Sequence, residues 1–229
     1  DHYQLNGTKS VVLNAASADV ILVSARTEGQ ATDARGISLF LVPGDSEGLL
    51  RKDYPTVDGL RASEVLLENV RVPASALVGA EGAASQTLNT VINRGILAIS
   101  AEAVGAMAVL YQSTIDYSKQ RVQFDHPLSE FQVVKHRLTE MFIEYNLAKS
   151  LCMKATMLLN QNSGDAQRHI HALKFLIGKT SRFVGQNAVQ LHGGMGMTED
   201  LAIAHYFKRL MMIDVTFGHT DIHLDAFVQ

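Results

Sequence analysis

The chain has 229 residues, of which 47% are hydrophobic and 19% are charged, with a formal net charge of −3 at pH 7. This is an ordinary globular composition, long enough for one large domain or two small ones. The sequence has no block of like charge and no basic stripe, so we expect no nucleic acid as a partner. No apolar run approaches the length of a membrane span, so we expect no membrane partner either.

The single cysteine, Cys152, cannot form an internal disulfide. It falls on the apolar face of a predicted helix, where a small buried residue is a simpler interpretation than a reactive thiol. A chain without disulfides fits a reducing compartment, and we expect a cytoplasmic protein. The sequence opens on Asp1 without a Met, already in strand-like sequence, so we interpret it as part of a longer polypeptide.

Residues 1–78 are predicted to form β-structure. Short β-rich runs predict strands at 9–14, 19–26, 36–43, 60–69 and 70–78. Asn6-Gly7 predicts a turn ahead of the first run, and the polar segment 27–35 predicts a hairpin loop between the second and third. Several such runs in series are typical of an antiparallel sheet or a piece of a barrel.

The apolar period changes to that of a helix after residue 82. A first helix is predicted at 83–119, with an apolar face made by Leu88, Val91, Ile92, Ile96, Ile99, Ala103, Met107 and Leu110. A second is predicted at 131–159, where apolar residues recur at steps of three and four, as in helices packed nearly parallel. A third is predicted at 166–191, and two short ones at 200–212 and from 221 onward.

The predicted fold class is therefore α+β. It consists of an antiparallel β-domain piece at 1–78, followed by an all-α domain of the four-helix-bundle type at 79–229. The loop from Arg121 to Gln132 enters the second long helix, with Pro127 just ahead of it. A cationic loop at a helix start can hold an anionic ligand, although a solvated loop explains the same residues.

Other motifs exclude several classes of site. Gly193-Gly194-Met195-Gly196 closes a helix instead of following a strand, so it does not match a dinucleotide fingerprint. It is either a plain helix stop or a stop that also brings bare backbone close to a ligand. His169 and His171 face different sides of a helix, and the paired Glu-x-x-His of a di-iron bundle is absent, so we expect no metal. Neither a nucleophile elbow nor a Walker loop occurs, so those hydrolase and NTPase templates fail.

Several blocks of sequence resemble, in the right order, the acyl-CoA dehydrogenase family. Leu5–Lys9, Gly36–Val42, Gly59–Ser63 and Val70–Pro73 resemble its middle β-domain, and Gly79–Gly82 resembles the exit from that domain. Arg121–Gln132 resembles the family's flavin-binding motif, and Gln190–Asp200 resembles its second signature. The resemblance implies an α-helical domain and the start of the β-domain upstream of this chain.

The resemblance also implies FAD as cofactor and oxidation of an acyl-CoA thioester to the 2-enoyl-CoA. A carboxylate would remove the α-proton while the β-hydrogen leaves as hydride to the flavin. The family holds FAD at a subunit interface, so we expect a homodimer, a tetramer or a hetero-oligomer with a related subunit, and an electron-transferring flavoprotein or similar acceptor. Arg94 would line the substrate pocket, or it would simply pair with a neighbouring residue. The residues that match the family's FAD contacts are Arg121, Gln123, Phe124, Gln132, Gln190, Leu191, His192, Gly193, Gly194 and Thr220.

The chain departs from the family pattern at the catalytic base. The stretch with the family's catalytic glutamate aligns with Phe217–Thr220, which puts Gly218 at the position of that glutamate. Some members carry the glutamate just before the arginine that matches Arg94, and here that residue is Asn93. We therefore assign no catalytic residue; a missing general base costs roughly 10²–10⁴ in rate. Asp221 or Asp225 could replace it only if the backbone shifted.

Two more departures concern the flavin. Val11-Val12-Leu13 stands where the family commonly has aromatic-x-Thr facing the flavin ring, and Asp125 replaces the usual glycine after Phe124. Segments 53–62 and 205–214 most resemble small subunits of two-subunit bacterial enzymes that act on pimeloyl-type dicarboxylic or steroid side-chain CoA esters.

Three hypotheses follow. The protein is an active dehydrogenase with an unusual base, or a non-catalytic interface subunit that completes the FAD site of a catalytic partner. A flavin-free helical scaffold also fits the fold, but it leaves the Arg121 and Gln190 blocks unexplained. We interpret Glu102, on the first predicted helix, as a structural residue that pairs with a neighbour.

Overall fold

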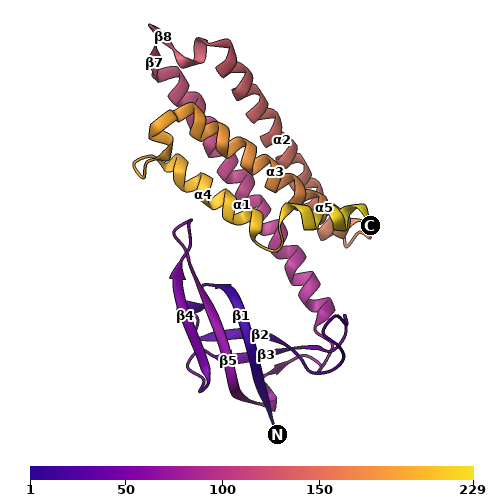
Figure 1. Cartoon of the computed structure of the whole chain (residues 1–229). Helices are drawn as coiled ribbons and strands as arrows, with labels where there is room; N and C mark the ends of the chain where they lie inside the picture. The colour runs from indigo at the N-terminus through magenta and orange to yellow at the C-terminus, as the bar shows by residue number, and fades with distance from the viewer. The chain divides into compact units, whose positions relative to one another are not determined.

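The computed structural model describes residues 1–229 as two compact units, Asp1–Val91 and Ile92–Gln229. The predicted α+β class is confirmed: antiparallel strands fill the first unit, and five α-helices account for most of the chain after them (Figure 1). The predicted domain boundary between residues 78 and 79 stays a prediction.

The first unit contains two three-stranded antiparallel sheets. One has the order β1-β5-β4 and the other the order β2-β3-β6. Apolar side chains of both sheets form one core, in which Phe40, Val42, Val65 and Val70 are fully buried. The strands are β1 (His2–Leu13), β2 (Val20–Arg26), β3 (Ile37–Pro43), β4 (Leu49–Pro55), β5 (Arg61–Pro73) and β6 (Leu77–Val78).

Three features of the β-unit correct the sequence prediction. The turn predicted at Asn6-Gly7 is wrong, because the pair lies inside β1, where the register against β5 shifts between Leu5 and Gly7. The two strands predicted at 60–69 and 70–78 are largely one strand, β5, in which pairing continues past Asn69 despite its left-handed φ of 55°. β4 was not predicted. It is an edge strand that pairs only with β5, and because most of its residues are exposed it has no clear apolar pattern.

The second unit is a helical bundle, and α1 begins before it. The five predicted helices are confirmed to within a few residues. They are α1 (Ser85–Gln120), α2 (Gln132–Asn160), α3 (Ala166–His192), α4 (Ala202–Val215) and α5 (Thr220–Val228). Two short 3-10 turns, Leu128–Glu130 and Gly193–Met197, precede α2 and follow α3.

The apolar faces predicted for α2 and α1 differ in outcome. The α2 face is confirmed, because Met141, Ala148 and Cys152 are buried in the bundle core. Burial raises the pKa of the Cys152 thiol, which fits a packing residue. On α1, however, Val91 and Ile92 are exposed, because the core of the bundle includes α1 only from residue 96 onward.

α1 also corrects the expectation about membrane spans. By length and composition alone it is long and apolar enough to cross a membrane. The core helix of a helical bundle passes the same test, and α1 buries Ile96, Ala103, Met107 and Leu110 among the other helices. Length and composition therefore make α1 a candidate span without assigning it to a membrane.

Candidate functional site

The loop between α1 and α2 is a short hairpin at one end of the bundle (Figure 1). β7 (Val122–Gln123) pairs with β8 (His126–Pro127), and Phe124 and Asp125 form the two-residue turn. Both turn residues have left-handed φ angles, 53° for Phe124 and 66° for Asp125. This conformation suits a two-residue hairpin but strains a bulky residue, and Asp tolerates it better than most. Asp125 therefore takes a backbone conformation that glycine would adopt more freely.

The hairpin presents polar and aromatic groups to solvent. The Phe124 side chain is 86% exposed, with its ring edge-on to Phe131 at a centroid distance of 6.4 Å. Arg121 is exposed, and its guanidinium has no ion-pair partner within the chain. Gln123 and Gln132 are exposed as well. The loop thus offers one cation, two amides and one aromatic ring to a ligand.

The C-terminal end of α3 lies beside this hairpin. The His192 imidazole stacks on the Tyr117 ring of α1, with centroids 4.3 Å apart, and the Tyr117 hydroxyl donates to the His192 carbonyl at 3.4 Å. Burial lowers the pKa of His192, and its Nδ1 donates to the Ala188 carbonyl oxygen at 2.8 Å. The ring is therefore a neutral packing group at neutral pH.

A second contact places α2 at the same end. Arg137, in the second turn of α2, donates to the Asn187 side chain of α3 at 2.9 Å. The structure therefore brings the Arg121 hairpin, the start of α2 and the block from Gln190 to Gly194 to one end of the bundle. Gln190 is exposed there and Leu191 is half-buried.

The glycines after α3 differ in their surroundings. A Cβ added to Gly193 or Gly194 would meet no atom within 4 Å, so the backbone there is open to a ligand. A Cβ at Gly196 would lie 2.8 Å from the Val189 carbonyl oxygen, so this glycine is required by packing. The motif is thus a helix stop whose first two residues leave the backbone accessible, as a phosphate would need.

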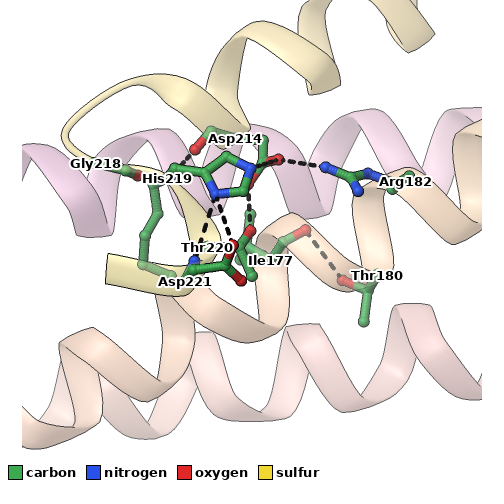
Figure 2. Close-up of polar contacts among 9 residues, drawn as sticks. Ile177, Thr180, Arg182, Asp214, Gly218, His219, Thr220 and Asp221 are labelled. Atoms are coloured by element: carbon green, nitrogen blue, oxygen red, sulfur yellow. Dashed lines mark hydrogen bonds and ion pairs between the residues drawn. The ribbon is translucent and has the colours of Figure 1, made fainter. Parts of the chain in front are cut away.

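Thr220, the remaining residue predicted to contact FAD, lies in a different part of the bundle. Its hydroxyl donates to Asp214 at 2.5 Å (Figure 2). A Cβ added to Gly178 of α3 would lie 2.0 Å from that hydroxyl oxygen. Gly178 precedes Gln190 by twelve residues, which is about 18 Å along the helix axis. Within one chain, Thr220 therefore does not join the hairpin group.

Asp214 organises a polar cluster that the sequence analysis missed. Its carboxylate is buried and accepts from Arg182 of α3 at 3.0 Å, and His219 Nε2 lies 3.5 Å away (Figure 2). A buried carboxylate needs such partners, because an unpaired buried charge is costly. Its position after Leu210 and Ile213, on the buried face of α4, was the available signal.

An open pocket of about 390 Å³ adjoins this cluster, and its lining includes Arg182, His219 and Asp221. The Asp221 side chain is 84% exposed, and its carboxylate lies 3.6 Å from His219 Nδ1. The other lining residues of the pocket come from α2, α3 and Thr220. Asp221 thus faces α3, whereas Phe217 lies against Gly95 of α1, where an added Cβ would be 2.8 Å from the phenylalanine ring.

Gly218, which the resemblance predicts to lie at the position of the catalytic glutamate, has a φ of 102°. A Cβ added there would lie 2.9 Å from His223 Nε2. His223 is buried, and burial lowers its pKa; its Nδ1 lies 3.0 Å from Nδ1 of His171, whose pKa burial also lowers. No group of three or more His, Cys, Asp or Glu residues that could hold a metal ion occurs in the chain.

Lys174 of α3 is a fully buried cation that the sequence analysis also missed. Its ammonium donates to the carbonyl oxygens of Asp214 at 2.7 Å and of Gly218 at 2.9 Å. Burial lowers the pKa of Lys174 to about 8, and the charge of Asp214 opposes that shift. The signal was its spacing, since Lys174 follows Ile170 by four residues and precedes Ile177 by three, on the buried face of α3.

Three residues considered in the sequence analysis, Asn93, Arg94 and Glu102, lie on α1. Arg94 is exposed and Asn93 is half-buried. Glu102 forms a two-pronged ion pair with Arg209 of α4, with N···O distances of 2.5 and 2.9 Å. The expected pairing of Glu102 with a neighbour is therefore confirmed.

The comparisons with known proteins agree over the whole chain. Residues 67–229 match the family described as acyl-CoA dehydrogenase, C-terminal domain, and residues 1–70 match acyl-CoA dehydrogenase, middle domain. A probable acyl-CoA dehydrogenase of Bacillus subtilis (strain 168), YngJ, is 31% identical over 226 residues, covering 97% of this chain and 59% of the relative.

Solved structures show the same likeness. An acyl-CoA dehydrogenase from Geobacillus kaustophilus superposes with a TM-score of 0.93 at 29% identity, covering 100% of this chain and 61% of the other. PigA, solved with FAD and proline, superposes with a TM-score of 0.92 at 27% identity, covering 99% and 59%. This chain spans between 59% and 61% of the length of these three proteins. From its sequence and its fold, the chain belongs to the acyl-CoA dehydrogenase family.

Proposed function

We propose that the full-length protein is an FAD-dependent acyl-CoA dehydrogenase subunit that takes part in converting an acyl-CoA thioester to the 2-enoyl-CoA. One observation carries the proposal: at one end of the bundle, an arginine without an ion-pair partner lies near an open, glycine-containing helix end. A flavin pyrophosphate is dianionic, and it needs a directional cation and accessible backbone N–H groups. Arg121 is a cation of this kind, and Gly194 offers exposed backbone, whereas the N–H of Gly193 already donates to the Gln190 carbonyl oxygen.

The residues of the hairpin and of the α3 end have separate tasks in this proposal. Arg121 would offset one of the two charges of the pyrophosphate, and Phe124 would pack its exposed ring on the cofactor. The amides of Gln132 and Gln190 orient the adenosine end. FAD, when bound, supplies the acceptor for the hydride, and the structure of PigA with FAD supports a flavin site in this fold.

Thr220 supports an oligomer. Thr220 lies against Gly178, which is about 18 Å along α3 from Gln190, so in this proposal one chain would present two separate sets of flavin contacts. We infer that the hairpin reaches the FAD of a neighbouring subunit, whereas Thr220 belongs to another cofactor site. The assembly is a homodimer, a tetramer or a hetero-oligomer with a related subunit.

A second candidate function is that of a non-catalytic subunit that completes the FAD site of a catalytic partner. The observation that favours it is the absence of a carboxylate at both family positions of the base, which are Gly218 and Asn93 here. The contacts of two nearby carboxylates support this candidate, since Glu102 is paired with Arg209 and Asp221 lines a pocket with residues of α2 and α3. The base would then come from the partner.

We propose an acyl-CoA substrate of the pimeloyl or steroid side-chain type, bound in part by Arg94, and an electron-transferring flavoprotein or a similar acceptor. The resemblance of segments 53–62 and 205–214 to small subunits supports this choice. Cytoplasmic location is proposed from the single cysteine, which is buried.

The test is anaerobic reduction of the full-length protein, purified alone and after co-expression with a related subunit. If the protein alone carries flavin that bleaches on addition of acyl-CoA, it is a dehydrogenase in its own right. If it carries flavin only with the partner, it is an interface subunit. An intact assembly that contains no flavin and takes up no added FAD would contradict both.

A further inference from the structure

We propose that Lys174 and His223 are positioning residues that hold the turn at Phe217 and Gly218 in a conformation without room for a side chain at position 218. This inference rests on the proposed function, because that function makes position 218 the family's place for the base. Three features of the turn support it: the backbone of Gly218, the imidazole behind it and the buried ammonium.

The first feature is the backbone conformation of Gly218 itself. Its φ of 102° lies in a region that glycine enters freely and that residues with a Cβ rarely adopt. Phe217 just before it also has a left-handed φ, 59°. Two consecutive residues of this kind make a tight turn between α4 and α5. A glutamate at position 218 would require a different backbone path.

The second feature is the position of the His223 imidazole. A Cβ on Gly218 would point at His223 Nε2, only 2.9 Å away. The ring cannot easily move, because Nε2 donates to the carbonyl oxygen of Phe217 at 2.9 Å. A carbonyl only accepts, so the neutral ring carries its hydrogen on Nε2, and Nδ1 accepts from Nδ1–H of His171 at 3.0 Å. The hydrogen bond to His171 thus holds the ring from its other side.

The third feature is the pair of hydrogen bonds donated by the Lys174 ammonium. It donates to the carbonyl oxygen of Gly218, and also to that of Asp214 in the last turn of α4. Both carbonyls of the turn are therefore fixed: that of Phe217 by α5 through His223, and that of Gly218 by α3 through Lys174. A change of φ at Gly218 would break at least one of these buried hydrogen bonds.

It follows that the turn cannot accept the base by a single substitution. A carboxylate introduced at position 218 would start toward a buried imidazole instead of an open site. The turn is built around glycine, and the surrounding residues maintain it. A catalytic carboxylate for the proposed reaction must then come from another position or another subunit.

A double-mutant cycle in the full-length protein, with its partner subunit if it has one, tests the inference. The variants are Gly218→Glu, His223→Ala and the double variant, and Gly105→Glu is the matched control. Gly105 is exposed on α1, and an added Cβ there would meet no atom within 4 Å. The readout is the Tm from far-UV circular dichroism, measured with all variants in the same flavin state, because bound flavin would raise the Tm.

We expect Gly218→Glu to lower the Tm by several degrees more than Gly105→Glu does. The loss in the double variant should be smaller than the sum of the two single losses, because alanine at position 223 vacates the space that the new Cβ needs. A second cycle with Lys174→Met should show coupling too. If Gly218→Glu does not fold, Gly218→Ala and Gly105→Ala replace the glutamate variants.

Equal Tm values for Gly218→Glu and Gly105→Glu, or strictly additive losses in the cycles, would overturn the inference. The proposed function fails separately, through an assembly that takes up no FAD, and that result leaves the Tm cycles interpretable.

Discussion

The Tyr117 ring on α1 and the His192 imidazole on α3 stack with an angle of 27° between their planes and a centroid distance of 4.3 Å. The hairpin begins just after Tyr117, at Arg121, and the open glycines begin directly after His192. This aromatic contact therefore joins the helix end that leads into the hairpin to the helix end that leads into the open glycines.

Tyr117→Leu should loosen the contact between these two helix ends. We expect the free energy of unfolding to fall by about 1 kcal/mol, since aromatic pairs of this kind contribute roughly 0.5–1.5 kcal/mol beyond the area that they bury. The flavin content of the purified full-length assembly should fall as well. Urea unfolding and flavin absorbance measure the two effects. Tyr117→Phe is the control: it keeps the ring and removes only the 3.4 Å hydrogen bond to the His192 carbonyl oxygen, so an equal effect of the two variants would contradict a role for stacking.

Arg121→Ala should weaken FAD binding without unfolding the protein. A hydrogen bond to a charged group contributes roughly 1.5–3 kcal/mol, which corresponds to about a 10- to 100-fold increase in Kd. The FAD affinity of Arg121→Lys should lie between those of the parent and Arg121→Ala, because lysine keeps the charge but loses the two-pronged geometry. Titration of the flavin-free assembly with FAD measures the three affinities.

The control for Arg121 is Lys119→Ala, which removes an exposed cation two residues earlier on α1. If the two alanine variants lose the same affinity, then a general charge effect explains the result, and the specific role of Arg121 is wrong.

The buried histidines predict a loss of stability in acid. Burial lowers the pKa values of His171, His192 and His223 from 6.5. Below that pH the unfolded chain binds more protons than the folded chain, so stability that is present above about pH 6.5 is lost as the pH falls. Urea unfolding at a series of pH values between about 8 and 5 measures the slope.

His223→Gln should make this acid slope shallower. A glutamine can still donate to the Phe217 carbonyl and accept from His171, but it does not titrate. His136→Gln, a change at an exposed residue of α2, is the control. A slope that stays the same in His223→Gln would show that burial of this histidine does not contribute to the pH dependence.

Lys174→Met should destabilise the bundle by about 1–3 kcal/mol, because buried carbonyl groups lose their donor. The pH dependence offers a sharper test. Since the pKa of Lys174 is lowered from 10.5 to about 8, the unfolded chain binds more protons between these values, and the parent gains stability as the pH rises from 8 to 10.5. The methionine variant should lack this gain, and Lys179→Met, at an exposed position, should keep it. Parallel curves for the parent and Lys174→Met would contradict the lowered pKa.

The sequence predicted the helices well, because local periodicity determines them. The steps of three and four along α2 place Met141, Ala148 and Cys152 on one face, and the structure buries that face. β4 carried no such signal. Leu50 is 54% exposed and is followed by Arg51, Lys52 and Asp53, so the strand depends on pairing with β5 and not on its own pattern.

The site was less predictable for a related reason. The hairpin and the α3 end were identified from motifs, and the bundle brings them to the same end. The partners of Lys174 lie forty or more residues away along the chain, and those of His223 include His171 on another helix. Spacing within one helix showed that Lys174 faces inward, but only the three-dimensional path of the α4–α5 turn shows what it binds. The φ of Gly218 is likewise a property of that path.

The turn residue of the β7–β8 hairpin has a consequence for the electrostatics of the loop. Asp125 places a negative charge four residues after Arg121, and Glu130 adds another, so the segment from 121 to 130 carries no net positive charge when His126 is neutral. Long-range attraction would therefore contribute little to capture of a dianion, and short directional contacts would have to suffice. Raising the ionic strength screens long-range attraction far more than it screens short directional contacts. Retention of flavin by the assembly should accordingly be nearly insensitive to salt.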